Sequence, residues 1–464
     1  MTNDAWSLDA TDLIAGYRGG ALAPDRVAAL MLARIARIDP DLGAYSALNP
    51  EAEAEAEASA ARWRAGAPIG PLDGVPVIIK DNLVARGMPA AWGNAELARR
   101  IAQHDELPVA RLRAAGAVVL GKGNTPEFAV EGYTDNLTFG PTRNPFDPAL
   151  TPGGSSGGVV AAVAAGLATL GIGTDGGGSI RRPAGYVGLT GLKPGIGHVP
   201  RSGGLAQVLL DFEVVGPLAR SARDVALMDA VLRGPDRRDP PSRLRAEPVA
   251  GAPLRVLHVA RIGDAPCDGA ILAATEALAA RLAALGCEVT TGAMPFDLGP
   301  LNAIWGQIAE IGLARYFALD PAVAAAAAPK YRDMAGRGGA IDAPAMWAML
   351  DAVRDLRAAA SAAFARWDVI LTPSSAAMPW PARDAFPPMI DGVAVGPRGH
   401  AVYTGWVNAA GHPAISVPAA PRGAALPIGV QLVGDLGAED VLLTLAARLE
   451  REGFVWPALA RRTD

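Results

Sequence analysis

The chain of 464 residues has only two cysteines, Cys267 and Cys287, only five histidines, and an aromatic content of 5%. Two cysteines cannot build a disulfide framework, so we expect reduced thiols and a cytoplasmic protein. None of the five histidines has a local sequence setting that demands catalysis. Any catalytic residues therefore have to be sought first among residue types other than histidine.

Strong charge and long hydrophobic runs are also missing. The net charge is −5 and only 19% of residues are charged, which gives no basic surface to indicate a nucleic acid or an anionic membrane as partner. The first residues, Met1-Thr-Asn-Asp-Ala-Trp, lack the charged and apolar regions of a signal peptide. The apolar run at 159–172 is interrupted by glycine and is shorter than the roughly 18 residues of a spanning helix.

What the chain does have is an alternation of short apolar runs and longer helical patterns. Length alone suggests about three domains, but the alternation continues throughout and predicts one α/β domain over residues 1–464, with a large central β-sheet covered by helices on both faces. Strands are expected at 75–79, 117–120, 169–172, 189–192, 212–217, 254–259, 287–291, 368–371, 414–417 and 429–433. Helices are expected at 7–38 (two short ones), 50–65, 105–115, 126–130 (short), 158–167, 221–233, 268–285, 300–318, 343–366 and 438–452, with an exposed connection at 234–253.

Two glycine-rich segments resemble nucleotide-binding motifs without satisfying them. Residues 116–123 nearly spell a phosphate-binding loop, but Gly123 stands where a Ser or Thr should bind magnesium. Residues 171–176 match a dinucleotide fingerprint, but the glycines and Pro183 that follow make a poor helix start. Both are better read as strands that end in glycine turns.

A third motif, residues 153–157, matches the G-x-S-x-G elbow of α/β-hydrolases. That elbow needs a strand running directly into the serine, and here the preceding residues 147–152 read as a loop. It also needs a downstream histidine, which His400 or His412 could supply. A Ser-His esterase therefore stays open as an alternative.

Two serines in beds of glycine are the strongest candidates for chemistry. Ser155 lies in Thr151-Pro-Gly-Gly-Ser-Ser-Gly-Gly158, and Ser179 follows Gly176, Gly177 and Gly178, whose N–H groups can form a concavity for a negative oxygen. Upstream, Lys80 ends an apolar strand, where burial should lower its pKa toward that of a usable base. Lysine and two serines together indicate a catalytic unit that needs no histidine.

Longer motifs around these residues resemble the amidase signature family. The resemblance is strong over residues 70–230 and weaker at 408–418 and 427–434, so it divides the domain into N-terminal helices (1–69), a signature core (70–230) and the remainder of the sheet, helices and substrate pocket (231–464). The matching motifs are Leu72-Asp-Gly-Val-Pro-Val77, Lys80-Asp81, Gly121-Lys-Gly-Asn-Thr-Pro-Glu-Phe128, Gly140-Pro-Thr-Arg-Asn-Pro145, Pro152-Gly-Gly-Ser-Ser-Gly-Gly158, Gly173-Thr-Asp-Gly-Gly-Gly-Ser-Ile-Arg-Arg-Pro-Ala184 and Gly191-Leu-Lys-Pro194.

The resemblance implies the amidase signature fold with a large central mixed β-sheet, a Ser-Ser-Lys triad, and no metal or cofactor. Ser179 would be the nucleophile, Ser155, on a cis peptide, would relay a proton, and Lys80 would be the general base. The oxyanion donors would be the N–H groups of Gly176, Gly177, Gly178 and Ser179, and the loop would be held by Ser156, Asp175 and Arg181.

The substrate has to be inferred from the expected pocket wall, which is mostly apolar. It would comprise Phe128, Ala129, Val130 and Tyr133, with Trp305 and Trp406 as further aromatic surface. We therefore expect a stand-alone amidase for hydrophobic or aryl amides, extending to small carbamates (urethanes) and esters. The family's glutaminase-type subunits of tRNA-dependent amidotransferases are the main alternative, and a homodimer is a family-level expectation.

Overall fold

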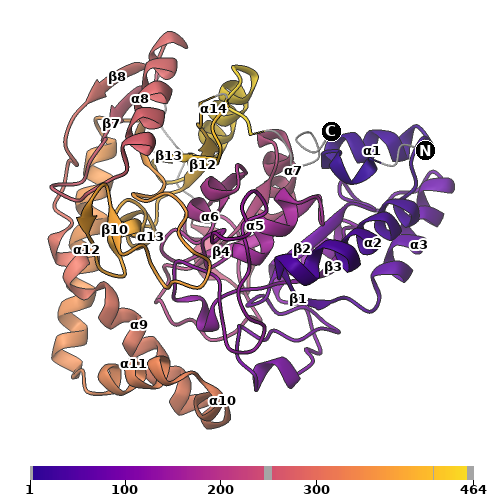
Figure 1. The fold of residues 1–464 in the computed structure, drawn as a ribbon, viewed down its shortest axis with the longest axis horizontal. Coiled ribbons are helices and arrows are strands. Elements are labelled where there is room, and N and C mark those ends of the chain that lie inside the picture. The colour runs from indigo at the N-terminus through magenta and orange to yellow at the C-terminus, as the bar shows by residue number, and fades with distance from the viewer. Residues whose placement is uncertain (1–3, 245–252, 422, 457–464) are drawn as a thin grey trace.

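A computed structural model describes residues 4–244, 253–421 and 423–456. Its core is a sheet of eleven strands in the order β1-β3-β2-β4-β6-β5-β12-β13-β9-β7-β8 (Figure 1). The strands are β1 (Tyr45–Leu48), β2 (Pro76–Lys80), β3 (Val118–Gly123), β4 (Leu170–Asp175), β5 (Thr190–Lys193), β6 (Val214–Ala219), β7 (Arg255–His258), β8 (Glu288–Thr291), β9 (Val369–Pro373), β12 (Ala414–Pro418) and β13 (Gly429–Gly434), and a separate small hairpin joins β10 (Met389–Ile390) and β11 (Val393–Ala394).

The sheet is mixed, as predicted. Strands β3, β2 and β4 run parallel at one end, and β9, β7 and β8 run parallel at the other. Between these two groups the pairs from β4 through β9 are antiparallel. All ten strands expected from the sequence are present, whereas β1 and the hairpin of β10 and β11 were not predicted.

Helices cover both faces of this sheet, which confirms the predicted fold class. The helices are α1 (Ala10–Arg18), α2 (Pro24–Leu42), α3 (Ala52–Arg64), α4 (Leu107–Ala114), α5 (Gly157–Ala164), α6 (Arg181–Tyr186), α7 (Ala222–Leu232), α8 (Gly269–Ala284), α9 (Gly299–Leu319), α10 (Pro321–Ala326), α11 (Pro329–Gly339), α12 (Ala343–Phe364), α13 (Gly405–Ala410) and α14 (Glu439–Arg451). Among the described residues, no helix combines the length and the apolar character needed to cross a membrane.

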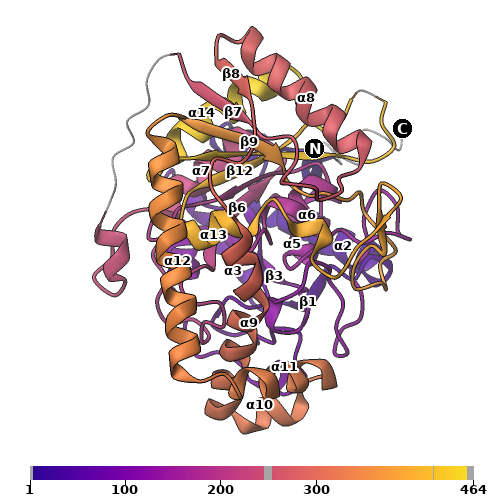
Figure 2. The same ribbon diagram turned by 90° about the vertical axis from the view of Figure 1, so that its left-hand side faces the viewer.

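Alternation along the strands separates the cores on the two faces. Val77 and Ile79 of β2 join the core formed with α4, α7, α8 and α14, whereas Ile78 between them joins the core formed with α2 and α5. At the other end of the sheet, Ile370 of β9 packs with α9, α12 and α13. Helices α9, α10 and α11 lie together at the foot of the long helix α12 (Figure 2).

Several helices depart from the sequence expectations. At 126–130, where a short helix was expected, only a single 3₁₀ turn forms, Glu127–Ala129. A longer helix is prevented because Phe128 (φ 58°) and Ala129 (φ 56°) adopt left-handed backbone angles. Helices α6, α10, α11 and α13 were not predicted. Part of the expected connection at 234–253 lies outside the described residues, and residues 240–243 of it form a 3₁₀ turn.

The arrangement of β2 and β4 positions the candidate site. The two strands are parallel neighbours, with Ile79 of β2 paired with Ile172 of β4. Their carboxyl ends therefore lie side by side, which places Lys80 next to the last residues of β4 and the glycine loop that follows.

Candidate active site

Lys80 is the last residue of β2, and its side chain is fully buried. Its Nζ donates hydrogen bonds to Ser155 Oγ at 2.7 Å, to Thr174 Oγ1 at 2.8 Å and to the Thr174 carbonyl at 3.2 Å. Burial lowers the pKa of Lys80 to about 7, although the negative charges of Glu213 and Asp175 raise it in part. The structure thus places at the end of β2 an amine that can lose its proton near neutral pH.

Ser155 lies in the loop that precedes α5, and the peptide bond from Gly154 to Ser155 is cis. Gly154 passes so close to the chain at Tyr133 that a Cβ on Gly154 would lie 2.1 Å from the Tyr133 carbonyl oxygen. Only glycine fits this approach. The loop delivers the Ser155 hydroxyl to Lys80, so these two predicted residues are brought together.

Ser179 lies between β4 and α6, and its carbonyl accepts a hydrogen bond from the Ser156 N–H at 3.3 Å. The loops that carry the two glycine-bedded serines are therefore neighbours. Across the described residues, the Ser179 hydroxyl has no hydrogen-bond partner, and the residue keeps 6% of its surface exposed. Its hydroxyl is therefore available to a small molecule.

The glycine loop before Ser179 presents three free N–H groups rather than the four predicted. The Gly178 N–H donates to Asp175 Oδ1 at 2.6 Å, so it is already engaged. The N–H groups of Gly176, Gly177 and Ser179 have no acceptor among the described residues. The prediction that Gly178 supplies an oxyanion donor therefore needs correction, because its amide closes the loop onto Asp175.

Asp175 anchors this loop through a buried ion pair with Arg181. Arg181 donates to both carboxylate oxygens, from Nε at 3.0 Å and from Nη2 at 2.9 Å. Burial alone would raise the pKa of Asp175, but the charge and hydrogen bonds of Arg181 hold it well below its usual range. Asn408, from α13, adds a hydrogen bond to the Asp175 carbonyl at 2.7 Å.

Ser156, the third predicted supporting residue, donates from Oγ to the Thr174 carbonyl at 3.2 Å. Ser156, Asp175 and Arg181 thus all lie in or beside the two loops that carry Ser155 and Ser179. Their contacts fix those loops against the end of β4.

Sequence reasoning missed the polar network behind Lys80. The Thr174 hydroxyl accepts from Lys80 and donates to Glu213 Oε2 at 3.2 Å, while Asn82 Nδ2 donates to it at 3.1 Å. Glu213 is in turn paired with Arg201. The local signal was Thr174 at the end of a buried strand, but Glu213 reaches it only through the pairing of β4 with β6.

Phe128 and Ala129, which were expected in the pocket wall, are buried in the hydrophobic core. Phe128 has no exposed surface and makes edge contacts with Trp92, Phe317 and Tyr331, at centroid distances of 5.3–5.7 Å. Ala129 is buried in the same core, against which the half-buried Val130 packs. The structure thus makes Phe128 a core residue.

Two of the predicted pocket residues, Tyr133 and Trp305, contact the loops that carry Ser155 and Ser179. The Tyr133 backbone abuts Gly154, and its side chain lines a cavity of about 310 Å³ together with Tyr331 and Lys330. A Cβ on Gly177 would lie 2.7 Å from Cζ2 of Trp305, so this indole packs directly against the glycine loop, residues 176–179, which was predicted to hold an oxyanion (hereafter the oxyanion loop). Trp406 is instead buried against Phe296, at a centroid distance of 5.2 Å.

The rival motifs do not assemble other sites. Residues 118–123 form β3 with no helix following, and residues 170–175 form β4. In the described part of the chain, neither the His400 nor the His412 imidazole hydrogen-bonds to a serine side chain; the His400 backbone carbonyl accepts from Ser375 Oγ at 3.1 Å, and His412 Nδ1 contacts the Gly434 carbonyl at 3.2 Å. Nor does the described part hold a group of three or more His, Cys, Asp or Glu suited to a metal ion.

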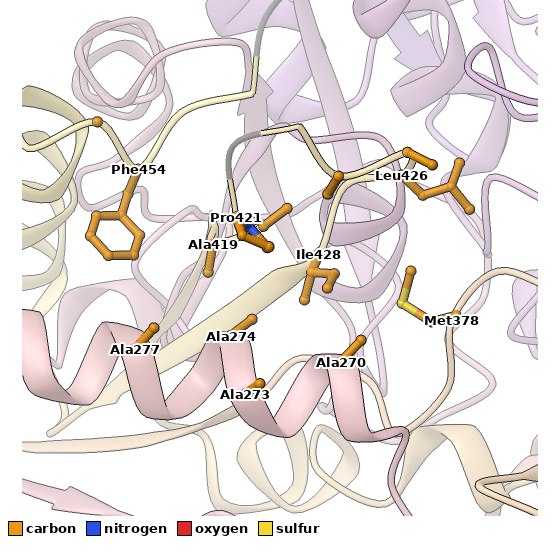
Figure 3. A pocket seen from close by; sticks show the side chains of 14 residues that line it. Ala270, Ala273, Ala274, Ala277, Met378, Ala419, Pro421, Leu426, Ile428 and Phe454 are labelled. Atoms are coloured by element: carbon orange, nitrogen blue, oxygen red, sulfur yellow. The ribbon is translucent and has the colours of Figure 1, made fainter.

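A separate cavity of about 540 Å³ lies between α8 and the segment around 419–428 (Figure 3). Its wall is almost wholly apolar, with Ala270, Ala274 and Ala277 of α8 facing Ile428 and Phe454. It contains none of the serines, lysines or glycines described above, so it offers no groups for acyl transfer.

Comparisons with known proteins agree with the geometry. The family model described as Amidase matches residues 26–443. The chain is 34% identical to a glutamyl-tRNA(Gln) amidotransferase subunit of Symbiobacterium thermophilum, covering 93% of each chain, and 32% identical to an acylamidase of Rhodococcus erythropolis, covering 96% of this chain and 95% of that one. Among solved structures, a bacterial aryl acylamidase of the amidase signature enzymes superposes with a TM-score of 0.86 at 28% identity, covering 96% of each chain. The chain therefore belongs to the amidase signature family and is an amide-hydrolysing enzyme.

Proposed function

We propose that this chain is a stand-alone amidase that hydrolyses hydrophobic or aryl amides through an acyl-enzyme on Ser179, with Ser155 as proton relay and Lys80 as general base. The observation that carries the proposal is the buried 2.7 Å hydrogen bond between Lys80 Nζ and Ser155 Oγ. A lysine with a pKa of about 7 is neutral in a large fraction of molecules at neutral pH, and so it can accept a proton.

The proposed reaction begins when neutral Lys80 takes the proton of Ser155 while Ser155 takes the proton of Ser179. Ser179 Oγ bonds to the substrate carbonyl carbon, and the carbonyl electrons move onto oxygen. The free N–H groups of Gly176, Gly177 and Ser179 are the donors available to that oxyanion. Each such donor contributes roughly 3–4 kcal/mol of transition-state stabilisation in comparable hydrolases.

The intermediate then collapses as the C–N bond breaks. The proton held by Lys80 returns through Ser155 to the departing nitrogen, so the amine leaves neutral and the acyl group stays on Ser179. Water enters, gives its proton along the same path, and attacks the ester carbon. Release of the acid restores the Ser179 hydroxyl and the neutral lysine.

The network behind Lys80 adjusts its basicity in this proposal. Glu213, acting through the Thr174 hydroxyl, favours the protonated lysine, whereas burial favours the neutral form. The balance keeps the lysine basic enough to accept a proton and neutral often enough to do so near pH 7.

The substrate range follows from the walls around the triad. Trp305 packs against Gly177, and Tyr133 packs against Gly154. These aromatic residues favour substrates whose acyl or amine group has apolar or aromatic surface. The same acyl transfer serves small carbamates and esters, since both present a carbonyl carbon with a heteroatom leaving group. Relatives that act as acylamidases support this reading.

A second candidate is the glutaminase-type subunit of a tRNA-dependent amidotransferase. Its support is the 34% identity to the Symbiobacterium amidotransferase chain over 93% of both chains. Such a protein would release ammonia from glutamine for a partner, rather than turn over an anilide alone. The third alternative, a Ser-His esterase, has no support from the buried surroundings of His400 and His412.

One experiment separates these functions. The purified chain alone is assayed with acyl 4-nitroanilides, an aryl carbamate and L-glutamine. We expect release of 4-nitroaniline without any partner. Turnover of glutamine alone, with no anilide hydrolysis, would overturn the stand-alone amidase in favour of the glutaminase.

A second experiment tests the nucleophile. A fluorophosphonate probe should label the native chain and the control Ser361→Ala, which changes an exposed serine of α12, but not Ser179→Ala. Thermal melting of all three checks that they fold. Labelling that persists in Ser179→Ala would refute the assignment.

A further inference from the structure

A group of basic side chains without acidic partners lies next to the oxyanion loop. Arg398 places its guanidinium carbon 4.6 Å from the ring centroid of Trp305, and Trp305 is the residue that packs against Gly177. Gly405 lies beside both, since a Cβ there would be 3.1 Å from Trp305 Cζ3 and 3.3 Å from Arg398 Nη2. Arg398 is therefore separated from the oxyanion loop by one indole ring.

Arg398 is exposed, and within the described part of the chain it forms no hydrogen bond or ion pair. Other arginines of this protein are paired: Arg181 binds Asp175, and Arg201 binds Glu213 and Glu106. The contact of Arg398 with an aromatic face leaves the edge of its guanidinium, which carries the N–H donors, free to bind an acceptor.

The neighbouring Arg182 adds to the positive potential, whereas His400 is neutral, because burial and the charges of Arg182 and Arg398 lower its pKa well below the usual value. Arg182 is buried and binds the Gly177 carbonyl and Thr404 Oγ1, but its Nε has no partner among the described residues. His400 is buried with neither ring nitrogen hydrogen-bonded. Although part of the Arg398 surface is exposed, protein atoms packed around its guanidinium reduce its hydration and, together with repulsion from Arg182, lower its pKa; no carboxylate acts in the opposite direction.

Positive charges held together without a counter-ion are costly, and an anion that binds between them removes the cost. The planar guanidinium matches a carboxylate, which can accept two parallel N–H bonds from it. The contact with the Trp305 ring holds the guanidinium beside the loop that carries Gly177.

We propose that Arg398, stacked on Trp305, binds a carboxylate of the substrate, so that the enzyme favours amides carrying a carboxylate on the acyl or the amine part. This inference rests on the proposed amidase function and narrows its substrate class. Arg182 holds the oxyanion loop through Gly177 and adds positive potential to the same site.

The test uses two matched substrate pairs that differ in one carboxylate. The acyl pair is succinyl 4-nitroanilide and butyryl 4-nitroanilide, and the amine pair is 4-acetamidobenzoate and acetanilide. We expect kcat/KM to favour the charged member of at least one pair by about 10- to 100-fold, the range for hydrogen bonds to a charged group.

Arg398→Met should abolish that preference mainly through KM, and Arg398→Lys should retain part of it. The matched control is Arg366→Met, because Arg366 is also exposed and stacks on a tryptophan, Trp367, at 5.7 Å. The control should leave the ratio between charged and neutral substrates unchanged. An equal loss for charged and neutral substrates in Arg398→Met would mean that Arg398 only supports Trp305, and would overturn the proposal, as would a native enzyme without preference.

Binding gives a readout that does not need turnover. Calorimetric titration of Ser179→Ala with N-phenylsuccinamate and N-phenylbutanamide should give tighter binding of the charged ligand, lost in the Ser179→Ala/Arg398→Met double variant. If no anilide is turned over but this difference holds, the amidase proposal fails and the anion site stands. If anilides are turned over but neither ratio nor binding depends on Arg398, the anion site fails alone.

Discussion

Replacing Glu213 by glutamine should move the pH dependence of the enzyme to lower pH. Glu213 Oε2 accepts from Thr174 Oγ1 at 3.2 Å, and Thr174 Oγ1 accepts from Lys80 Nζ at 2.8 Å. The carboxylate thus lies within about 6 Å of the ammonium, where two unit charges interact by about 3 kcal/mol at an effective dielectric constant of 20. That energy corresponds to about two pKa units.

The net effect is smaller because Glu213 is only half-buried, so water screens its charge, whereas the other charged groups that act on Lys80 are the same in both proteins. Arg201 is paired with the same carboxylate, and its positive charge lowers the pKa of Lys80. Asp175 raises that pKa and Arg182 lowers it, and both remain in the variant. We therefore expect the Lys80 pKa to fall by about one unit, from about 7 toward 6.

The assay is the profile of kcat/KM for a 4-nitroanilide between pH 5 and 9, which reports ionisations of the free enzyme. In the native enzyme activity should rise as Lys80 loses its proton around pH 7, and in Glu213→Gln the rise should occur about one unit lower. Glu131→Gln is the control, since it removes a surface carboxylate paired with Lys330. An unchanged or higher midpoint in a folded Glu213→Gln would refute the coupling of Glu213 to Lys80.

Three further predictions concern the remaining groups. Lys80→Ala should lose least activity at high pH, where hydroxide replaces the base in part, and a uniform loss from pH 6 to 10 would contradict the base role. Thr174→Val, which keeps shape but removes the hydroxyl that bridges Lys80 and Glu213, should lower kcat/KM of the anilide by about tenfold; an unchanged value would show that the bridge is dispensable. Asp175→Asn should lower the free energy of unfolding by about 3–5 kcal/mol in urea titrations, because Arg181 would be left as a buried, unpaired charge; a loss below about 1 kcal/mol would mean that Arg181 finds other compensation.

The parts of the fold that the sequence predicts are those set by local patterns. Residues 77–79 are branched and apolar, and the structure places them in β2 with Lys80 at its end. The unpredicted helix α6 begins directly after the glycine loop and contains Pro183, features that disfavour a helix locally. It is stabilised by the contact of Arg181 with Asp175, six residues earlier, and by long-range contacts of Arg181 with Gln431 and Asn408.

The candidate site was predictable to the same extent. Lys80 and the two serines stand in recognisable segments, but their environment is set by partners far away in the chain. Trp305 and Arg398 are 93 positions apart, and no spacing rule brings them to Gly177. The hydrogen bond from the Gly178 N–H to Asp175 could have been predicted from the sequence, because aspartate side chains often accept from a backbone N–H a few residues later in a turn.

In the proposed mechanism, the distribution of charge around Lys80 explains why a lysine can act as a base. The charge of Asp175 is balanced by Arg181, and that of Glu213 by Arg201, so neither carboxylate forms an ion pair with Lys80. If either did, the ammonium would be stabilised and the base lost at neutral pH. Burial then favours the neutral amine, and its hydrogen bonds go to the Ser155 and Thr174 hydroxyls instead. The arginines that neutralise these carboxylates are thus as necessary to the chemistry as the serines, and Arg398, which neutralises none within the described residues, is left for the substrate.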